Sequence, residues 1–171
     1  TDGIGLVTDI KTNHGGSLTN KSLLVLGAGG AARGILQPFL DENPALICIA
    51  NRTVSKAEAL AELYTQSGNI SACAFDDLEG RQFDWIINAT SASLHGDTLP
   101  VPVELVGEKT WCYDLMYANE PTAFCRWSEQ AGAGKSMEGL GMLVEQAAES
   151  FLLWRGIRPQ TREVIDRLRS S

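Results

Sequence analysis

A glycine-rich segment after a short apolar run has residue types and spacing that could bind a ligand. Residues 23–26 are Leu-Leu-Val-Leu, and Gly27, Gly29 and Ala32 then match the pattern G-x-G-x-x-G/A. The first glycine of this pattern permits a tight turn, the second lets the backbone approach a pyrophosphate, and the third small residue lets the next helix pack closely. Free N–H groups at the start of that helix would face the phosphates. The segment predicts a dinucleotide site, and a glycine-rich turn without a ligand is the alternative.

The end of the next apolar run indicates which dinucleotide would bind. An NAD site usually has an acidic residue about 20 residues after the fingerprint, where it accepts a hydrogen bond from the ribose 2′-hydroxyl. This sequence has Asn51-Arg52-Thr53 there and no carboxylate, and Lys56 follows one helical turn later. A guanidinium offers a planar set of donors that suits a 2′-phosphate. The pattern favours NADP; a solvated arginine followed by an N-cap threonine is the alternative.

Short apolar segments alternate along the chain with segments of helical periodicity. This alternation is typical of an α/β fold, a doubly wound parallel sheet of about six strands with helices on both faces. Pro38 is expected to kink or shorten its helix. We expect strands at residues 23–26, 45–50, 70–75, 83–89, 111–115 and 135–137, and helices at 3–12, 30–41, 54–64, 122–130, 139–156 and 162–169.

Ligands of such sheets bind at the carboxyl ends of the strands. The expected strand ends that carry polar or glycine residues are the Gly27 loop and residues 51–53, 88–91 and 114–117. We therefore expect these four segments to form one site.

Length, composition and charge limit the class of protein. The 171 residues suit a single domain, residues 1–171, and 44% apolar with 20% charged residues indicates a globular fold. The net charge of −7 argues against a nucleic-acid partner. No apolar run reaches membrane-spanning length and no signal peptide is visible, so we expect a cytoplasmic protein without a membrane partner.

The cysteines and histidines do not have the spacing of a metal site. The four cysteines are widely separated and none forms a C-x-x-C pair. We expect reduced thiols and no metal. The residues in question are Cys48, Cys73, Cys112, Cys125, His14 and His95.

Several motifs together resemble the shikimate dehydrogenase family, and in particular its NADP-binding half. They are Thr1-Asp2-Gly3, residues 27–31, Asn-Ala-Thr-Ser at 88–91, Tyr-Asp-Leu-Met-Tyr at 113–117, Gly-Leu-Gly-Met-Leu-Val-Glu-Gln-Ala at 139–147, and Asn51-Arg52-Thr53. The likeness spans essentially the whole chain. The family motif Asn-Thr-Asp-Gly would begin just before residue 1, so the N-terminal substrate domain is expected to lie outside these residues.

The resemblance implies a reaction and a set of site residues. The reaction is the reversible NADPH-dependent reduction of 3-dehydroshikimate to shikimate, a step of chorismate and aromatic amino-acid biosynthesis. By similarity, the pyrophosphate contacts are Gly27, Ala28, Gly29, Gly30 and Ala31; the 2′-phosphate contacts are Asn51, Arg52, Thr53 and Lys56; the nicotinamide side has Thr90, Ser91, Leu115, Gly139 and Met142; and the substrate contacts are Asp2, Tyr117 and Gln146.

The family's catalytic pair is a lysine and an aspartate. Asp2 matches the aspartate, which would make it catalytic as well as substrate-binding, and it could also serve as a helix N-cap. The lysine belongs to the N-terminal domain, so the 171 residues alone are expected to be inactive. Two positions depart from the family: Glu138 replaces a frequent Asp, and Lys56 replaces a frequent Arg.

The predicted long helix at 139–156 has three strips at a period of 3.6 residues. Glu138, Glu145 and Glu149 are expected to face solvent, and Gln146 lies between the apolar and charged strips, where it suits the wall of a cleft. The expected apolar stripe consists of Leu140, Leu143, Val144, Ala147, Phe151 and Trp154.

Two other functions remain open at this point. One is an NAD-preferring quinate/shikimate dehydrogenase, against which Arg52 argues. The other is a non-catalytic module that binds NADP.

Overall fold

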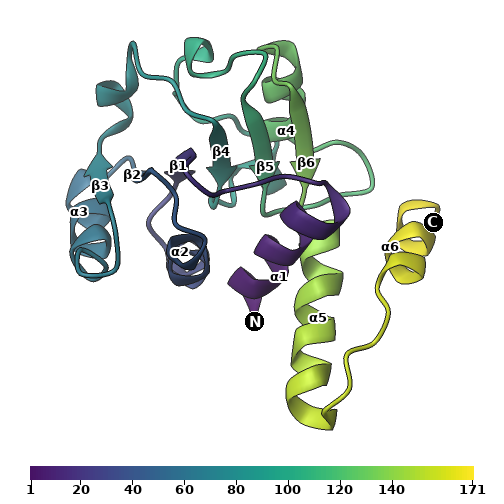
Figure 1. Cartoon of the computed structure of the whole chain (residues 1–171). Helices are drawn as coiled ribbons and strands as arrows, with labels where there is room; N and C mark the ends of the chain where they lie inside the picture. Colours follow the sequence, from purple (N-terminus) through teal and green to yellow (C-terminus); the bar gives the residue numbers. More distant parts are fainter.

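Six parallel strands form one sheet in the order β3-β2-β1-β4-β5-β6 (Figure 1). The computed structural model describes residues 1–171. The strand order reverses between β1 and β4, because β2 and β3 lie on one side of β1 and β4, β5 and β6 lie on the other, which is the arrangement of the doubly wound dinucleotide-binding fold. The predicted fold class is therefore confirmed. The strands are β1 (Ser22–Leu26), β2 (Leu46–Ala50), β3 (Ile70–Cys73), β4 (Trp85–Asn88), β5 (Trp111–Asp114) and β6 (Lys135–Glu138).

Helices and single turns cover both faces of the sheet. The helices are α1 (Asp2–Thr8), α2 (Gly30–Asp41), α3 (Val54–Glu62), α4 (Ala123–Gln130), α5 (Leu140–Arg155) and α6 (Arg162–Arg169). A π-helical turn, η1 (Asp9–Asn13), continues α1, and 3-10 turns occur at η2 (Phe75–Leu78), η3 (Ala92–His95) and η4 (Val103–Leu105). None of the helices has the length and apolar character that a bilayer crossing requires.

Alternation along the strands produces two apolar cores, one on each face. Leu23 and Val25 of β1 belong to a core with α1, α2 and α3, whereas Leu24 and Leu26 belong to a core with the turns η2 and η4 and with Phe124 of α4. The strands are apolar on both sides because both faces are covered. This burial fixes the register of the strands and hence the level of their carboxyl ends.

Pro38 does not shorten its helix, which was one of the two effects that the sequence predicted. Helix α2 continues through Pro38 to Asp41. Pro38 lies near the last turn, where its missing N–H deprives only the Gly34 carbonyl of a helical partner. Gly3 of α1 packs there, because a Cβ on Gly3 would lie 2.6 Å from the Gly34 oxygen. The disruption is thus absorbed at the crossing of α1 and α2.

Helices α1 and α5 lie side by side and antiparallel (Figure 1). The hydroxyl of Ser150 lies 3.1 Å from that of Thr1. One turn further along α1, a Cβ on Gly5 would lie 2.7 Å from the backbone nitrogen of Gln146. Glycine is therefore required at residue 5 for this close approach.

The predicted faces of α5 were partly wrong. Glu145 is 1% exposed, whereas Phe151 is 44% and Trp154 is 79% exposed. Asn13 and Thr161 donate to Glu145 at 3.0 and 2.7 Å, and Arg158 pairs with it at 2.8 Å. These partners come from η1 and from the segment after α5, which helical periodicity cannot reveal. The C-terminal half of α5 extends beyond α1 and leaves its apolar side chains exposed (Figure 1).

Candidate functional site

The fingerprint loop lies at the carboxyl edge of the sheet, where β1 and β4 are neighbours. Gly27 has a φ of +107°, and a Cβ there would lie 3.0 Å from Cγ2 of Thr90 and 3.2 Å from the carbonyl oxygen of Ala89. Both the backbone conformation and the contact therefore require glycine. The two loops touch at the point where the strand order reverses, which is where such folds bind ligands.

The start of α2 is open and has no cap. Gly29 is the N-cap residue, with an extended backbone and no side chain to accept from the first helical N–H groups. A Cβ built on Gly29 or Gly30 would meet no atom within 4 Å. The protein itself does not need glycine at these positions for packing. Free N–H donors beside open space are what a pyrophosphate requires, so this loop fits a dinucleotide.

The end of β2 carries two cations that have no protein partner. Arg52 and Lys56 are exposed and take part in none of the ion pairs of the structure. Thr53 is the N-cap residue of α3, as the alternative interpretation proposed, but its side chain makes no capping hydrogen bond. The side-chain amide of Asn51 donates to the Thr53 carbonyl at 3.0 Å, which holds the turn. These donors fit a phosphate.

The loops after β4 and β5 are tied together by buried polar side chains. Asn88 accepts from the hydroxyl of Thr90 at 2.7 Å and donates to Asp114 at 3.1 Å. Ser91 follows Thr90 as the N-cap residue of η3, without a side-chain capping bond. Asp114 accepts from the hydroxyl of Thr122 at 2.7 Å. The sequence analysis did not single out Asn88, Asp114 or Thr122 individually; the only signal was that polar residues close two apolar strands.

Gly139 lies directly against the loop after β5. Its N–H donates to the carbonyl of Met116 at 2.9 Å, and a Cβ at Gly139 would overlap the carbonyl oxygen of Leu115. Leu115 is 7% and Met142 8% exposed, so both have only a small free surface. The structure thus places the predicted nicotinamide-side residues around the ends of β4, β5 and β6.

Two carboxyl groups near these strand ends have raised pKa values. Burial raises the pKa of the Asp114 carboxyl, although the hydrogen bonds it accepts, led by that from Thr122, oppose the shift. Burial also raises the pKa of Glu138, and the nearby charge of Asp114 adds to that effect. One oxygen of Glu138 is buried without a hydrogen-bond partner. This part of the site therefore disfavours negative charge.

The predicted substrate residues lie on separate elements. Asp2 is the first residue of α1, and it lies beside Gly34 of α2. Thr1 is the N-cap residue, so the prediction of Asp2 as N-cap was wrong: the helix begins one residue earlier than that role requires. Gln146 is half-buried on α5 against Gly5, and Tyr117 is 45% exposed after β5. The three side chains make no hydrogen bond with one another.

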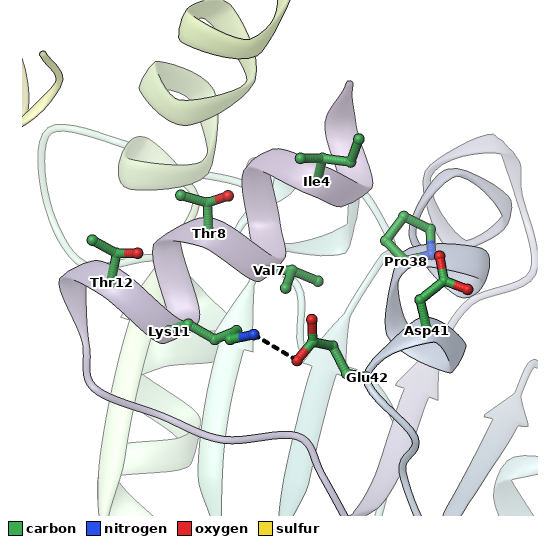
Figure 2. A pocket seen from close by; sticks show the side chains of 8 residues that line it. All are labelled: Ile4, Val7, Thr8, Lys11, Thr12, Pro38, Asp41 and Glu42. Atoms are coloured by element: carbon green, nitrogen blue, oxygen red, sulfur yellow. Dashed lines mark hydrogen bonds and ion pairs between the residues drawn. The ribbon is translucent and has the colours of Figure 1, made fainter. Parts of the chain in front are cut away.

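A separate open hollow lies between α1 and α2, away from these loops. Its volume is about 360 Å³, and Figure 2 shows it framed by side chains of α1, η1 and the last turn of α2. Lys11 and Glu42, which both line it, form an ion pair of 2.8 Å. None of the predicted site residues lines it. No group of three or more His, Cys, Asp or Glu side chains is arranged to hold a metal ion.

Comparison with known proteins supports the reading of these loops. The family model described as Shikimate / quinate 5-dehydrogenase matches residues 9–96, and the model described as Shikimate 5'-dehydrogenase C-terminal domain matches residues 139–169. Among curated proteins, the shikimate dehydrogenase (NADP(+)) of Alkalilimnicola ehrlichii is 53% identical over 169 residues, which is 99% of this chain and 62% of that protein. That of Methylococcus capsulatus is 54% identical over 168 residues, 98% of this chain and 60% of the relative.

Solved structures agree with this result. An Ael1 enzyme from Pseudomonas putida superposes with a TM-score of 0.92 at 46% identity, covering 98% of this chain and 61% of that one. The shikimate 5-dehydrogenase of Thermus thermophilus, solved with NADP(H) and shikimate, superposes with a TM-score of 0.80 at 30% identity, covering 96% and 60%. The chain therefore spans about 60% of the length of the relatives it matches. With these matches and the doubly wound fold, the chain belongs to the shikimate / quinate 5-dehydrogenase family.

Proposed function

We propose that this chain is the NADP-binding domain of a shikimate dehydrogenase, which reversibly reduces 3-dehydroshikimate to shikimate with NADPH. The observation that carries the choice of cofactor is the end of β2. Two exposed cations, Arg52 and Lys56, have no partner there, and no carboxylate follows the strand. A 2′-phosphate would supply the missing negative charge. The names of the relatives, shikimate dehydrogenase (NADP(+)), support the same choice.

Different residues of the chain bind the pyrophosphate, the 2′-phosphate and the nicotinamide half of the cofactor. The N–H groups from Ala28 to Ala31 bind the pyrophosphate at the uncapped start of α2. Asn51, Arg52, Thr53 and Lys56 surround the 2′-phosphate. Bound NADPH supplies the hydride for the carbonyl carbon of the substrate. Thr90, Ser91, Leu115, Gly139 and Met142 orient the nicotinamide half of the cofactor and exclude water from it.

The substrate side is formed by exposed or half-buried polar groups. Tyr117 and Gln146 bind the hydroxyl or carboxylate groups of the substrate, and both have free hydrogen-bonding capacity. Asp2 lies beside α2 at the N-terminus of α1 and holds the substrate hydroxyl for proton transfer. The substrate is a small molecule. The net charge of −7 argues against a nucleic-acid partner.

We place the protein in the cytoplasm. All four cysteines are free and buried, which fits a compartment that keeps thiols reduced.

The test of this function compares the two nicotinamide cofactors. The 171-residue chain is titrated with NADP and with NAD in a calorimeter, and the full-length protein is assayed for shikimate oxidation with each. We expect tighter binding of NADP and shikimate-dependent formation of NADPH. Equal affinity for both cofactors, or turnover with NAD alone, would instead indicate the NAD-dependent quinate/shikimate type.

A further inference from the structure

Two buried side chains connect the loop after β4 to the loop after β5. They are Asn88, at the end of β4, and Asp114, at the end of β5. Asn88 is 1% and Asp114 0% exposed, so almost no surface of either residue is available to a ligand. We infer that Asn88 and Asp114 are positioning residues, which set the loops after β4 and β5 for the nicotinamide half of the cofactor. The inference rests on the proposed function, because that function defines the ligand of these loops.

Asn88 uses its whole side chain within the protein. Its Oδ1 accepts from the backbone N–H of Thr90 at 3.1 Å and from the hydroxyl of Thr90 at 2.7 Å. Its Nδ2 donates to Oδ1 of Asp114 at 3.1 Å and to the hydroxyl of Ser93 at 3.4 Å. One side chain thus determines the backbone and the rotamer of Thr90, the residue that contacts Gly27 of the fingerprint loop.

Asp114 does the same for the loop after β5. Its Oδ1 accepts from the backbone N–H of Met116 at 3.1 Å, and its Oδ2 accepts from the hydroxyl of Thr122 at 2.7 Å. The Met116 carbonyl in turn accepts from the N–H of Gly139 at 2.9 Å. Thr122 Oγ1 accepts from the N–H of Cys125 at 3.2 Å, which caps α4. The pair therefore connects loops from β4, β5 and β6.

The pair is not needed to hold the strands together. Strands β4 and β5 are already joined by a parallel ladder in which Asn88 and Asp114 are register partners. Burying a carboxylate opposes folding, and apolar residues of similar size often replace buried charges without loss of stability. What the side chains add beyond the ladder is the conformation of the residues just past the strand ends. These residues are the ones that the proposed function places beside the nicotinamide.

Asp114→Asn is the sharpest perturbation, because it keeps the shape of the side chain while it removes the charge and changes the hydrogen bonding. The new amide has one acceptor oxygen where the carboxylate has two. If the amide nitrogen faces Thr122, the Thr122 hydroxyl loses the acceptor for its proton. If it faces Met116, two N–H donors oppose each other. Either orientation releases one of the two loops.

The experiment uses two ligands that share one end. NADP contains the nicotinamide half, whereas adenosine 2′,5′-bisphosphate has only the adenine, one ribose and two phosphates. Both are titrated calorimetrically into the 171-residue chain and its variants. We expect Asp114→Asn and Asn88→Ala to raise the Kd for NADP by about tenfold and to leave the Kd for the bisphosphate within about twofold.

Two further variants separate positioning from general stability. Thr122→Val removes the hydroxyl that Asp114 accepts from, and we expect it to weaken NADP binding selectively; Thr122→Ser keeps the hydroxyl and should restore the wild-type Kd. The matched control is Ser22→Ala. Ser22 links β1 to Asp84 at the amino edge of the same sheet, with contacts of 2.8 to 3.1 Å. It should lower Tm without changing either Kd.

The outcomes are distinct. Equal losses for both ligands, or unchanged NADP binding in folded Asp114→Asn, Asn88→Ala and Thr122→Val, would overturn the positioning role and leave the proposed function intact. If Asp114→Asn does not fold, the comparison of Thr122→Val with Thr122→Ser tests the positioning role instead. A wild-type chain that bound neither ligand would refute the proposed function and the inference together.

Discussion

Replacement of Arg52 by alanine tests the cofactor assignment directly. Arg52 follows β2, is exposed and makes no ion pair, so its removal leaves no buried partner unsatisfied. The variant should therefore fold with an unchanged Tm. Its effect should be confined to ligands that carry a phosphate on the adenosine 2′-oxygen.

The size of the effect follows from the contact that is lost. A hydrogen bond to a charged group contributes about 1.5–3 kcal/mol. Because Arg52 is exposed, solvent screening places the loss near the lower end, about 1.5 kcal/mol or roughly tenfold in Kd. Lys56 remains one helical turn away and keeps part of the attraction. The loss should shrink further as the salt concentration rises, because exposed charges are screened over about 8–10 Å.

Calorimetric titration of NADP and NAD into wild-type and Arg52→Ala protein measures this loss. Arg167→Ala on α6 is the control, since Arg167 is an exposed arginine (79% side-chain exposure) whose ion pair with Glu163, 3.0 Å long, is itself exposed. We expect Arg52→Ala to weaken NADP alone and Arg167→Ala to change neither Kd appreciably. Equal losses of NADP and NAD affinity in Arg52→Ala would refute the role of Arg52 at the 2′-phosphate.

Three more predictions concern the fingerprint loop, the fully buried carboxyl of Asp9 at the start of η1, and turnover. Gly29→Val should leave Tm nearly unchanged, because a Cβ there meets no protein atom within 4 Å. It should weaken NADP binding at least about tenfold, because the side chain keeps the pyrophosphate away from the backbone. A parallel loss of Tm would contradict the open geometry. Burial raises the pKa of the Asp9 carboxyl, but the His14 ring, with Nε2 at 3.3 Å, and hydrogen bonds from Tyr113 and Asn13 lower it by more, so its folded-state pKa lies below the ordinary value of 3.8. The charged carboxylate thus stabilises the fold above the unfolded pKa, and this stabilisation is lost as pH falls through the lower folded pKa. Urea unfolding of Asp9→Asn should show its largest deficit above pH 3.8 and a smaller one in more acidic buffer; a deficit independent of pH would exclude the charge as its cause. The 171-residue chain should bind NADPH but not consume it with 3-dehydroshikimate, because the resemblance assigns the proton-donating lysine to the other domain of the family; turnover in a 340-nm assay would show that a proton donor lies within these residues.

Much of the fold could be predicted because its signals are local. Apolar runs such as residues 23–26 and 85–87 occur where strands are covered on both faces, and the structure places strands there. The Gly27 loop could be recognised because each glycine answers a steric need of the backbone. The bounds of α2 also agree with the prediction. The shortening expected at Pro38 does not occur, and the sequence could not show this, because Gly3, which packs against that turn, belongs to a different helix.

The errors arose where a residue's environment comes from distant parts of the chain. Glu145 was expected in solvent because helical periodicity separates it from apolar neighbours. The structure buries it because Asn13, 132 residues earlier, and Arg158 supply hydrogen bonds and charge. Phe151 and Trp154 were expected in the core but are exposed, because no other element covers that end of α5.

By itself, the sequence determined the class of fold, the position of the fingerprint loop and the absence of a carboxylate after β2, because these depend on residue type and spacing within short segments. Only the tertiary structure decided which strand ends meet. Asn88 and Asp114 lie 26 residues apart in the chain, yet parallel pairing of β4 with β5 brings their side chains within 3.1 Å. This hydrogen bond exists only after the sheet has formed, since the other partners of the two side chains, such as Thr90 and Met116, are close in sequence, whereas this contact requires β4 and β5 to be in register.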